Sequence, residues 1–137
     1  MKIKFLKKDP QVIIPTRGHY NDAGLDCYAL EDFKIRPNNG MIKVPLGFGL
    51  EVPDGYMAVL KPRSSMNAKG IITQVGTIDS GYRGEISAIF INANPFPVEF
   101  NKGDKICQLV IEPVVLADLV EDLVNDRGNG GFGSTGR

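Results

Sequence analysis

The chain has 137 residues, of which 42% are hydrophobic and 23% charged, and its 16 basic residues balance 16 acidic ones. This length and composition predict one soluble globular domain and exclude a second domain of ordinary size. Because the net charge is zero, no overall field attracts the chain to nucleic acid or to a membrane, and we expect neither as a partner.

The first ten residues and the two cysteines indicate the cellular compartment of the protein. Residues 1–10 are positively charged but no apolar stretch follows them, so we expect no signal peptide. No run is long and apolar enough to span a bilayer. Cys27 and Cys107 lie in apolar stretches, which favours two buried thiols, although a disulfide stays open. These observations predict a cytoplasmic protein.

Short strands separated by turns dominate the chain, and helical periodicity is almost absent. The 16 glycines and nine prolines divide it into runs rich in Val, Ile and Phe, as in all-β sandwiches, jelly rolls and small barrels. The only helical turn is expected at 64–69, opened by serines able to cap it. In chain order, the predicted strands are 3–6, 25–29, 41–45, 48–52, 56–61, 71–75, 85–92, 98–100 and 105–112.

The C-terminal stretch differs in composition from the rest. Residues 125–137 contain five glycines, and Phe132 is their only large apolar side chain. Such a segment cannot build a packed core. We therefore expect a β body over 1–124 and a flexible arm over 125–137.

The residue types that could carry chemistry are few. The single His19 and two isolated cysteines match no common zinc pattern, and nothing supports a Ser-His-Asp triad around His19. A metal, if one is used, is then a hard ion held by carboxylate, water and substrate phosphate, which indicates Mg²⁺.

Five stretches stand out from the apolar strands around them. Asp26 interrupts the apolar run 23–29, and by itself this fits an edge strand that faces water. In 62–66, Arg63 and two serines suit a phosphate clamp, although a surface arginine beside a helix cap explains them equally well. Gln108 lies in the apolar run 105–112, where a buried amide needs partners.

The other two stretches are rich in glycine. Residues 76–85 hold three glycines, two acids, an arginine and a tyrosine, and they exceed the length that a hairpin connection needs. We therefore expect them to be functional. Residues 127–136 resemble a phosphate-cradling loop, but they lack the lysine of a P-loop and no helix follows them.

Together, in this order and spacing, the five stretches resemble the five motifs of the trimeric dUTPase family. The strongest matches are GTIDSGYRGE at 76–85 and GGFGSTG at 130–136. The resemblance implies a jelly-roll subunit and a homotrimer whose active sites are shared between chains. It also implies that dUTP is hydrolysed to dUMP and pyrophosphate with Mg²⁺.

The resemblance assigns roles to individual residues. Asp79 is the catalytic residue that activates a water for attack on the α-phosphorus, and Asp26 holds Mg²⁺ through water. Tyr82 packs under the deoxyribose, while Phe132 stacks on uracil. The substrate-binding set is Arg63, Ser64, Ser65, Gly76, Thr77, Ile78, Tyr82, Gln108, Arg127, Phe132, Gly133, Ser134 and Thr135.

The chain departs from the family pattern at three places. Cys27 replaces a leucine, Ser65 and Met66 replace Gly-Leu, and Thr73 and Gln74 occupy a stretch where some relatives place a uracil-binding asparagine. The alternatives are a dCTP deaminase, a bifunctional deaminase–dUTPase, and a regulatory protein with the dUTPase fold. Tyr82 and the complete glycine-rich stretch favour the hydrolase.

Overall fold

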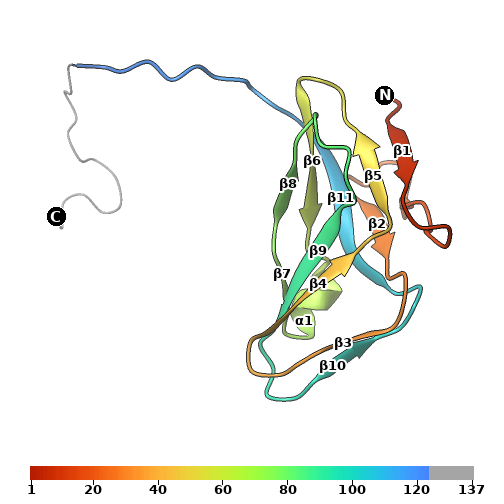
Figure 1. Cartoon of the computed structure of the whole chain (residues 1–137). Helices are drawn as coiled ribbons and strands as arrows, with labels where there is room; N and C mark the ends of the chain where they lie inside the picture. The colour runs from red at the N-terminus through yellow and green to blue at the C-terminus, as the bar shows by residue number, and fades with distance from the viewer. Residues whose placement is uncertain (124–137) are drawn as a thin grey trace.

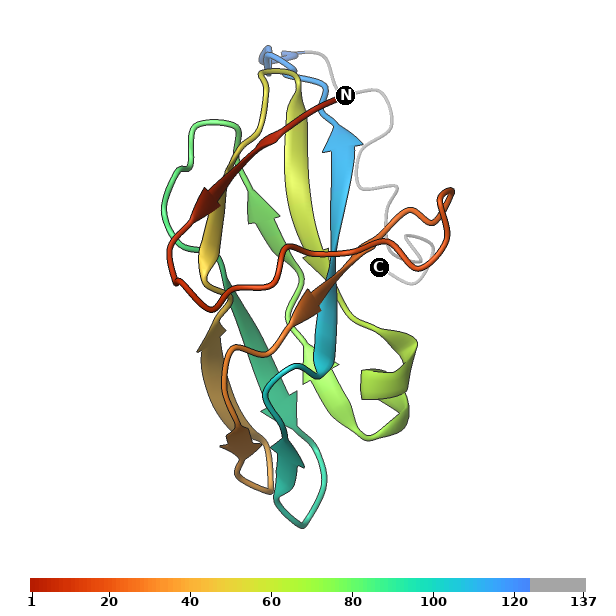
Figure 2. The same ribbon diagram turned by 90° about the vertical axis from the view of Figure 1, so that its right-hand side faces the viewer.

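The strands of the chain pair into four antiparallel sheets, shown by a computed structural model that describes residues 1–123 (Figures 1 and 2). A four-stranded sheet has the order β2-β11-β6-β8, a three-stranded sheet the order β4-β9-β7, and two pairs are β1-β5 and β10-β3. Most neighbouring strands are far apart in sequence, as in a jelly roll. The predicted all-β jelly-roll fold is confirmed. The elements are β1 (Lys4–Lys7), β2 (Leu25–Tyr28), β3 (Phe33–Ile35), β4 (Gly40–Pro45), β5 (Phe48–Glu51), β6 (Tyr56–Lys61), α1 (Ser64–Ala68), β7 (Ile71–Thr73), β8 (Gly76–Ile78), β9 (Ser87–Asn92), β10 (Val98–Phe100) and β11 (Lys105–Pro113).

The core lies between the sheets and follows from the two-residue period of the strands. Along β9, Ala88, Phe90 and Asn92 are buried while the residues between them are half-buried. Phe33 stacks on both Phe90 and Phe100, so that the β3–β10 pair closes one end of the core. Every second side chain of β9 therefore points into the core.

Asn92 is a polar residue in the core, and it is 0% exposed. Its amide donates to the carbonyls of Ile35, at 3.1 Å, and Phe96, at 2.9 Å. Its oxygen accepts from the backbone N–H of Asn94 at 3.0 Å. Because every polar atom of this side chain has a partner, Asn92 ties β9 to β3 without the cost of an unpaired buried amide.

Three sequence-based predictions need correction. The predicted strand 71–75 ends earlier, at Thr73, because β7 pairs with β9 only as far as that residue. Strands β3 and β8, of three residues each, are missing from the predicted strands. The expected serine cap of α1 is wrong: Arg63 occupies the N-cap, and no side chain bonds the free N–H groups there.

After β11 the chain leaves the body (Figure 1). At the point of departure, the N–H of Val114 donates to the carbonyl of Gly55 at 2.8 Å. Beyond it, five apolar side chains are between 81% and 97% exposed, namely Val115, Leu116, Leu119, Val120 and Leu123. The predicted arm, 125–137, lies outside the described residues. Within residues 1–123, no helix has the length and apolar character needed to cross a membrane.

Candidate functional site

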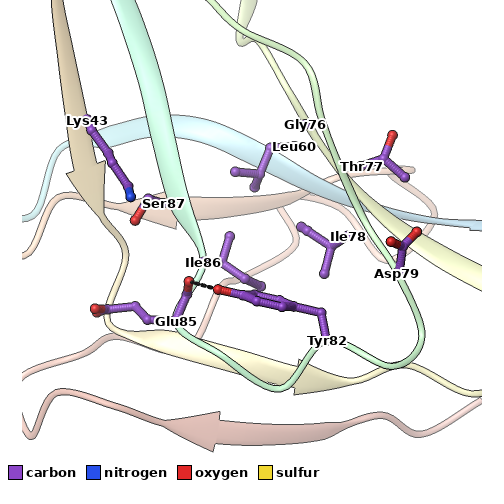
Figure 3. A pocket seen from close by; sticks show the side chains of 10 residues that line it. All are labelled: Lys43, Leu60, Gly76, Thr77, Ile78, Asp79, Tyr82, Glu85, Ile86 and Ser87. Atoms are coloured by element: carbon purple, nitrogen blue, oxygen red, sulfur yellow. Dashed lines mark hydrogen bonds between the residues drawn. The ribbon is translucent and has the colours of Figure 1, made fainter.

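A cleft of about 320 Å³ opens beside β8, within the size range of small-molecule sites. The chain leaves the β4-β9-β7 sheet after Thr73 and joins β6 at Gly76. Strands β8 and β9 therefore lie in different sheets, and the cleft lies between them. Its lining is Lys43, Leu60, Gly76, Thr77, Ile78, Asp79, Tyr82, Glu85, Ile86 and Ser87 (Figure 3).

Tyr82 lies along one side of the cleft, and the loop holds it there (Figure 3). Its hydroxyl donates to the carbonyl of Glu85 at 2.8 Å, and its N–H donates to the carbonyl of Asp79 at 3.1 Å. A Cβ on Gly84 would come within 2.6 Å of the Tyr82 hydroxyl oxygen. Glycine at position 84 is therefore what lets the ring fold back over its own loop.

The loop is fastened to the body by charged groups on both sides. Arg83 donates to the carbonyl of Ser80, and its Nε lies 3.5 Å from the Glu51 carboxylate on β5. The Glu85 carboxylate accepts from the N–H of Gly47 at 3.0 Å. Asp79, in contrast, is exposed, and its carboxylate lies at one end of the cleft in Figure 3. The arrangement leaves Asp79 open to a water or a ligand.

A second group of candidate residues gathers where β2, β11 and the end of β6 meet. The Asp26 carboxylate lies 3.2 Å from Nε of Arg63 and 3.5 Å from Nζ of Lys105. Arg63 also donates to the hydroxyl of Ser65 at 3.2 Å and to the carbonyl of Lys105 at 3.1 Å. We call Asp26, Arg63, Ser64, Ser65, Lys105 and Gln108 the charged cluster.

Gln108 belongs to this cluster because strand pairing places it beside Asp26. It pairs with Asp26 on one side and with Lys61 on the other, and its amide donates to the carbonyl of Pro62 at 2.9 Å. A Cβ on Gly24 would meet the Gln108 oxygen at 2.1 Å. The Gln108 amide, which is half-buried, therefore has the partner that the sequence led us to expect, and Gly24 makes room for it.

Lys105 is a charged residue of the cluster that the sequence did not single out. A β-bulge between Lys105 and Cys107 shifts the register of β11, and bulges re-aim side chains at such points. No spacing rule locates a bulge, so nothing in the sequence marked Lys105.

The structure divides the predicted site residues between two places. Gly76, Thr77, Ile78, Asp79 and Tyr82 line the cleft, and the remaining described ones belong to the charged cluster. Figure 1 shows the loop after β8 at one end of β6 and α1 at the other. Arg127, Phe132, Gly133, Ser134 and Thr135 lie outside the described residues.

Strand register measures the separation between the two groups. Asp26 on β2 and β8 are three strand spacings apart, and Asp79 lies about four residues along β6 from the level of Lys61. With about 4.8 Å between strands and about 3.3 Å per residue, Asp26 and Asp79 are about 20 Å apart. One chain therefore does not bring the two groups together.

The jelly roll, a cleft within the size range of small-molecule sites and a separate cluster of charged donors suit a protein that binds a phosphorylated small molecule. A model of the dUTPase family matches residues 10–136. The deoxyuridine 5'-triphosphate nucleotidohydrolase of Gloeothece citriformis is 42% identical over 142 residues, covering 99% of this chain and 97% of the relative. That of an Anaeromyxobacter species is 43% identical, covering 96% and 92%. The chain belongs to the dUTPase family of hydrolases.

Solved structures agree with this assignment at the level of the fold. The dUTPase of Staphylococcus bacteriophage 80alpha with dUPNHPP has a TM-score of 0.86 at 24% identity, covering 97% of both chains. A dUTPase variant from phage phi11 of S. aureus has a TM-score of 0.84 at 22% identity, and the match covers 90% of this chain and 98% of that chain. The structure of that variant reveals the coordination of a structural Mg(II) ion.

Proposed function

We propose that the protein hydrolyses dUTP to dUMP and pyrophosphate. The observation that carries the proposal is the cleft, where a carboxylate stands at one end and an aromatic ring lines the side. The names of the curated relatives point to the same substrate. In this scheme the base and sugar of the nucleotide fill the cleft, and the phosphates leave it at the end where Asp79 lies.

Asp79 acts on water. Its exposed carboxylate accepts a proton from a water as the water oxygen attacks the α-phosphorus. The bond between the α-phosphorus and the oxygen that bridges to the β-phosphorus breaks, and pyrophosphate leaves. A positioned carboxylate within hydrogen-bond reach of the water suits this step and requires no covalent intermediate. Tyr82 supports the sugar and leaves no room for a 2′-hydroxyl.

The charged cluster binds the triphosphate. Arg63 presents a planar donor fork that matches phosphate oxygens, and Lys105 and the serines add further donors. The Asp26 carboxylate lies 3.2 Å from the Arg63 guanidinium and 3.5 Å from the Lys105 ammonium, so it offsets part of their charge. Phosphoryl transfer depends on such positioning and charge stabilisation more than on reactive side chains.

The site of one nucleotide is assembled from different chains of a homotrimer. The separation of about 20 Å between Asp26 and Asp79 supports this, because both carboxylates act on one triphosphate. The exposed apolar side chains of residues 115–123 also suit a segment that packs on a neighbouring chain. Arg127 and Phe132, which lie outside the described residues, would supply contacts to the phosphates and base of a neighbour's site.

Mg²⁺ is the metal that the donor set fits. Within residues 1–123 no three His, Cys, Asp or Glu side chains gather to ligate a metal by themselves. Asp26 is a single carboxylate beside the phosphate-binding side chains, and Mg²⁺ is commonly held by one or two carboxylates together with substrate phosphates and water. Asp26 would hold the ion through its waters, and the ion would neutralise phosphate charge.

The test is pyrophosphate release across the nucleoside triphosphates, with Mg²⁺ and with a chelator. We expect release from dUTP alone, with strong dependence on Mg²⁺. Ammonia release from dCTP would instead identify a deaminase. A folded protein that releases neither product would support the regulatory alternative.

A further inference from the structure

Glu51 lies outside the cleft, yet it contacts the loop after β8, which carries Asp79 and Tyr82 (Figure 3). It is the last residue of β5, and it is half-buried. One of its carboxylate oxygens lies 3.5 Å from Nε of Arg83. The other lies 3.4 Å from Nζ of Lys4, its cross-strand partner on β1. The carboxylate therefore links the loop to the strand pair β1-β5.

The backbone of the loop lies directly on β5 at this point. Gly49 is two residues before Glu51, so the two residues face the same side of the strand, and Gly49 is buried. A Cβ on Gly49 would come within 2.6 Å of the carbonyl oxygen of Gly84 and within 2.8 Å of that of Arg83. The loop thus occupies the space that a side chain at position 49 would take. Of the four residues of β5, Glu51 is then the one whose side chain meets the loop on this face.

Arg83 connects Glu51 to the turn that carries the proposed base. Its guanidinium donates to the carbonyl of Ser80, while its Nε lies beside the Glu51 carboxylate. The turn is closed by the N–H of Tyr82, which donates to the carbonyl of Asp79 at 3.1 Å. A guanidinium is planar and rigid, so two acceptors together fix its direction. Glu51 therefore orients Arg83, and Arg83 holds the middle of the turn.

We propose that Glu51 is a positioning residue, which through Arg83 holds the turn in the geometry that the reaction needs. The side chains of Glu51 and Arg83 are 36% and 46% exposed, and ion pairs open to solvent stabilise a fold little. A displacement of about 1 Å in a reacting group nevertheless costs about 10²-fold in rate. The effect of Glu51 is therefore on turnover and on sugar discrimination, and not on the stability of the fold. This inference rests on the proposed function, because it takes Asp79 as the base and Tyr82 as the contact to the sugar.

The experiment compares Glu51→Leu with a matched control, Glu99→Leu. Glu99 on β10 also forms an exposed ion pair, with Lys34 at 3.2 Å, and it belongs to neither group of site residues. In Glu51→Leu the kcat for dUTP falls about 3- to 30-fold, less than a full displacement of 1 Å would cost. The preference for dUTP over UTP weakens as well, because Tyr82 lies on the same turn. Glu99→Leu keeps the wild-type kcat and preference, and both variants unfold at the wild-type urea midpoint.

A double-mutant cycle with Arg83 separates positioning from a general loss of packing. Because Glu51 acts through Arg83, Glu51→Leu lowers kcat in the wild-type chain and has no further effect on Arg83→Leu. Glu51→Gln keeps an acceptor oxygen for Arg83 and retains more turnover than Glu51→Leu; if Glu51→Leu does not fold, the cycle is run with Glu51→Gln.

Two results overturn the role of Glu51. One is a wild-type kcat and an unchanged preference for dUTP over UTP in the folded variant. The other is an equal loss of kcat on replacing Glu51 with Arg83 present and with Arg83 replaced. Failure of the wild type to release pyrophosphate from dUTP overturns the proposed function instead.

Discussion

Complementation between two inactive variants measures whether a site is shared between chains. Asp79→Asn removes the proposed base, with an expected loss of about 10²–10⁴ in turnover. Arg63→Ala removes a phosphate donor from the charged cluster, with an expected loss of about 10²–10³. Since the two groups lie about 20 Å apart in one chain, the proposed trimer requires each active site to take Asp79 from one chain and Arg63 from its neighbour.

The recovered activity follows from counting. When the two variants are unfolded together in equal amounts and refolded, each site draws Asp79 and Arg63 from an adjacent pair of chains. One of the four equally frequent combinations has both residues intact, so about one quarter of wild-type activity returns in a closed ring. Pyrophosphate release at saturating dUTP is the assay, after mixed trimers are verified by mass.

A control mixture shows how much activity returns when only one of the two residues is limiting. Asp79→Asn mixed with Lys34→Ala, whose lysine lies outside both groups, should return about one half, because only Asp79 is then limiting. If Asp79 and Arg63 of the same chain formed the site, the control would still return one half. The Arg63→Ala mixture would then stay at the level of the separate variants, and this result would refute the shared site.

Four further outcomes are expected. Asp79→Asn alone should keep dUMP affinity while turnover falls about 10²–10⁴-fold, and a folded variant with near-normal turnover would show that another group is the base. Tyr82→Ala should raise activity on UTP relative to dUTP, since a packed ring is lost; competing-substrate assays measure the ratio, and an unchanged ratio rules Tyr82 out as the gate. Asn92→Leu should lower the free energy of unfolding by about 2–4 kcal/mol, because the buried groups it bonds lose their partners; urea titration is the measurement, and a loss below the error of the fit would contradict the account. Both cysteines are free and buried, and the hydrogen bond to Cys107 and burial raise the pKa of Cys27. A thiol reagent at pH 8 should therefore react with neither until the protein unfolds, and rapid labelling of the native protein would contradict this.

Local patterns in the sequence were sufficient for the strands and for the chemically dense loop. Short β-branched runs between glycines and prolines identify most of the strands, because the two-residue period is visible along the chain. The polar content of 76–85 marked the cleft loop, with Asp79 and Tyr82 in it. The resemblance to one family likewise depends only on the order and spacing of residues, which are properties of the chain itself.

Pairing between distant strands depends on the tertiary structure. The sequence predicted a strand over 71–75 and none over 76–78, but Thr73 ends β7 and Gly76 begins β8 in a different sheet, and the cleft lies where the chain changes sheet. Lys105 meets Asp26 through a bulge whose position no periodicity records. Asn92 is satisfied by carbonyls of Ile35 and Phe96.

The division of the site between two places was likewise visible only in three dimensions. The order of the motifs along the chain does not give the distance between them in space. Only the register of β2, β11, β6 and β8 shows that Asp26 and Asp79 are about 20 Å apart. The sequence determined which side chains are present because local chemistry and period are properties of neighbouring residues. Which of them meet was decided by sheet order and register, because hydrogen bonding between strands joins residues that are remote along the chain.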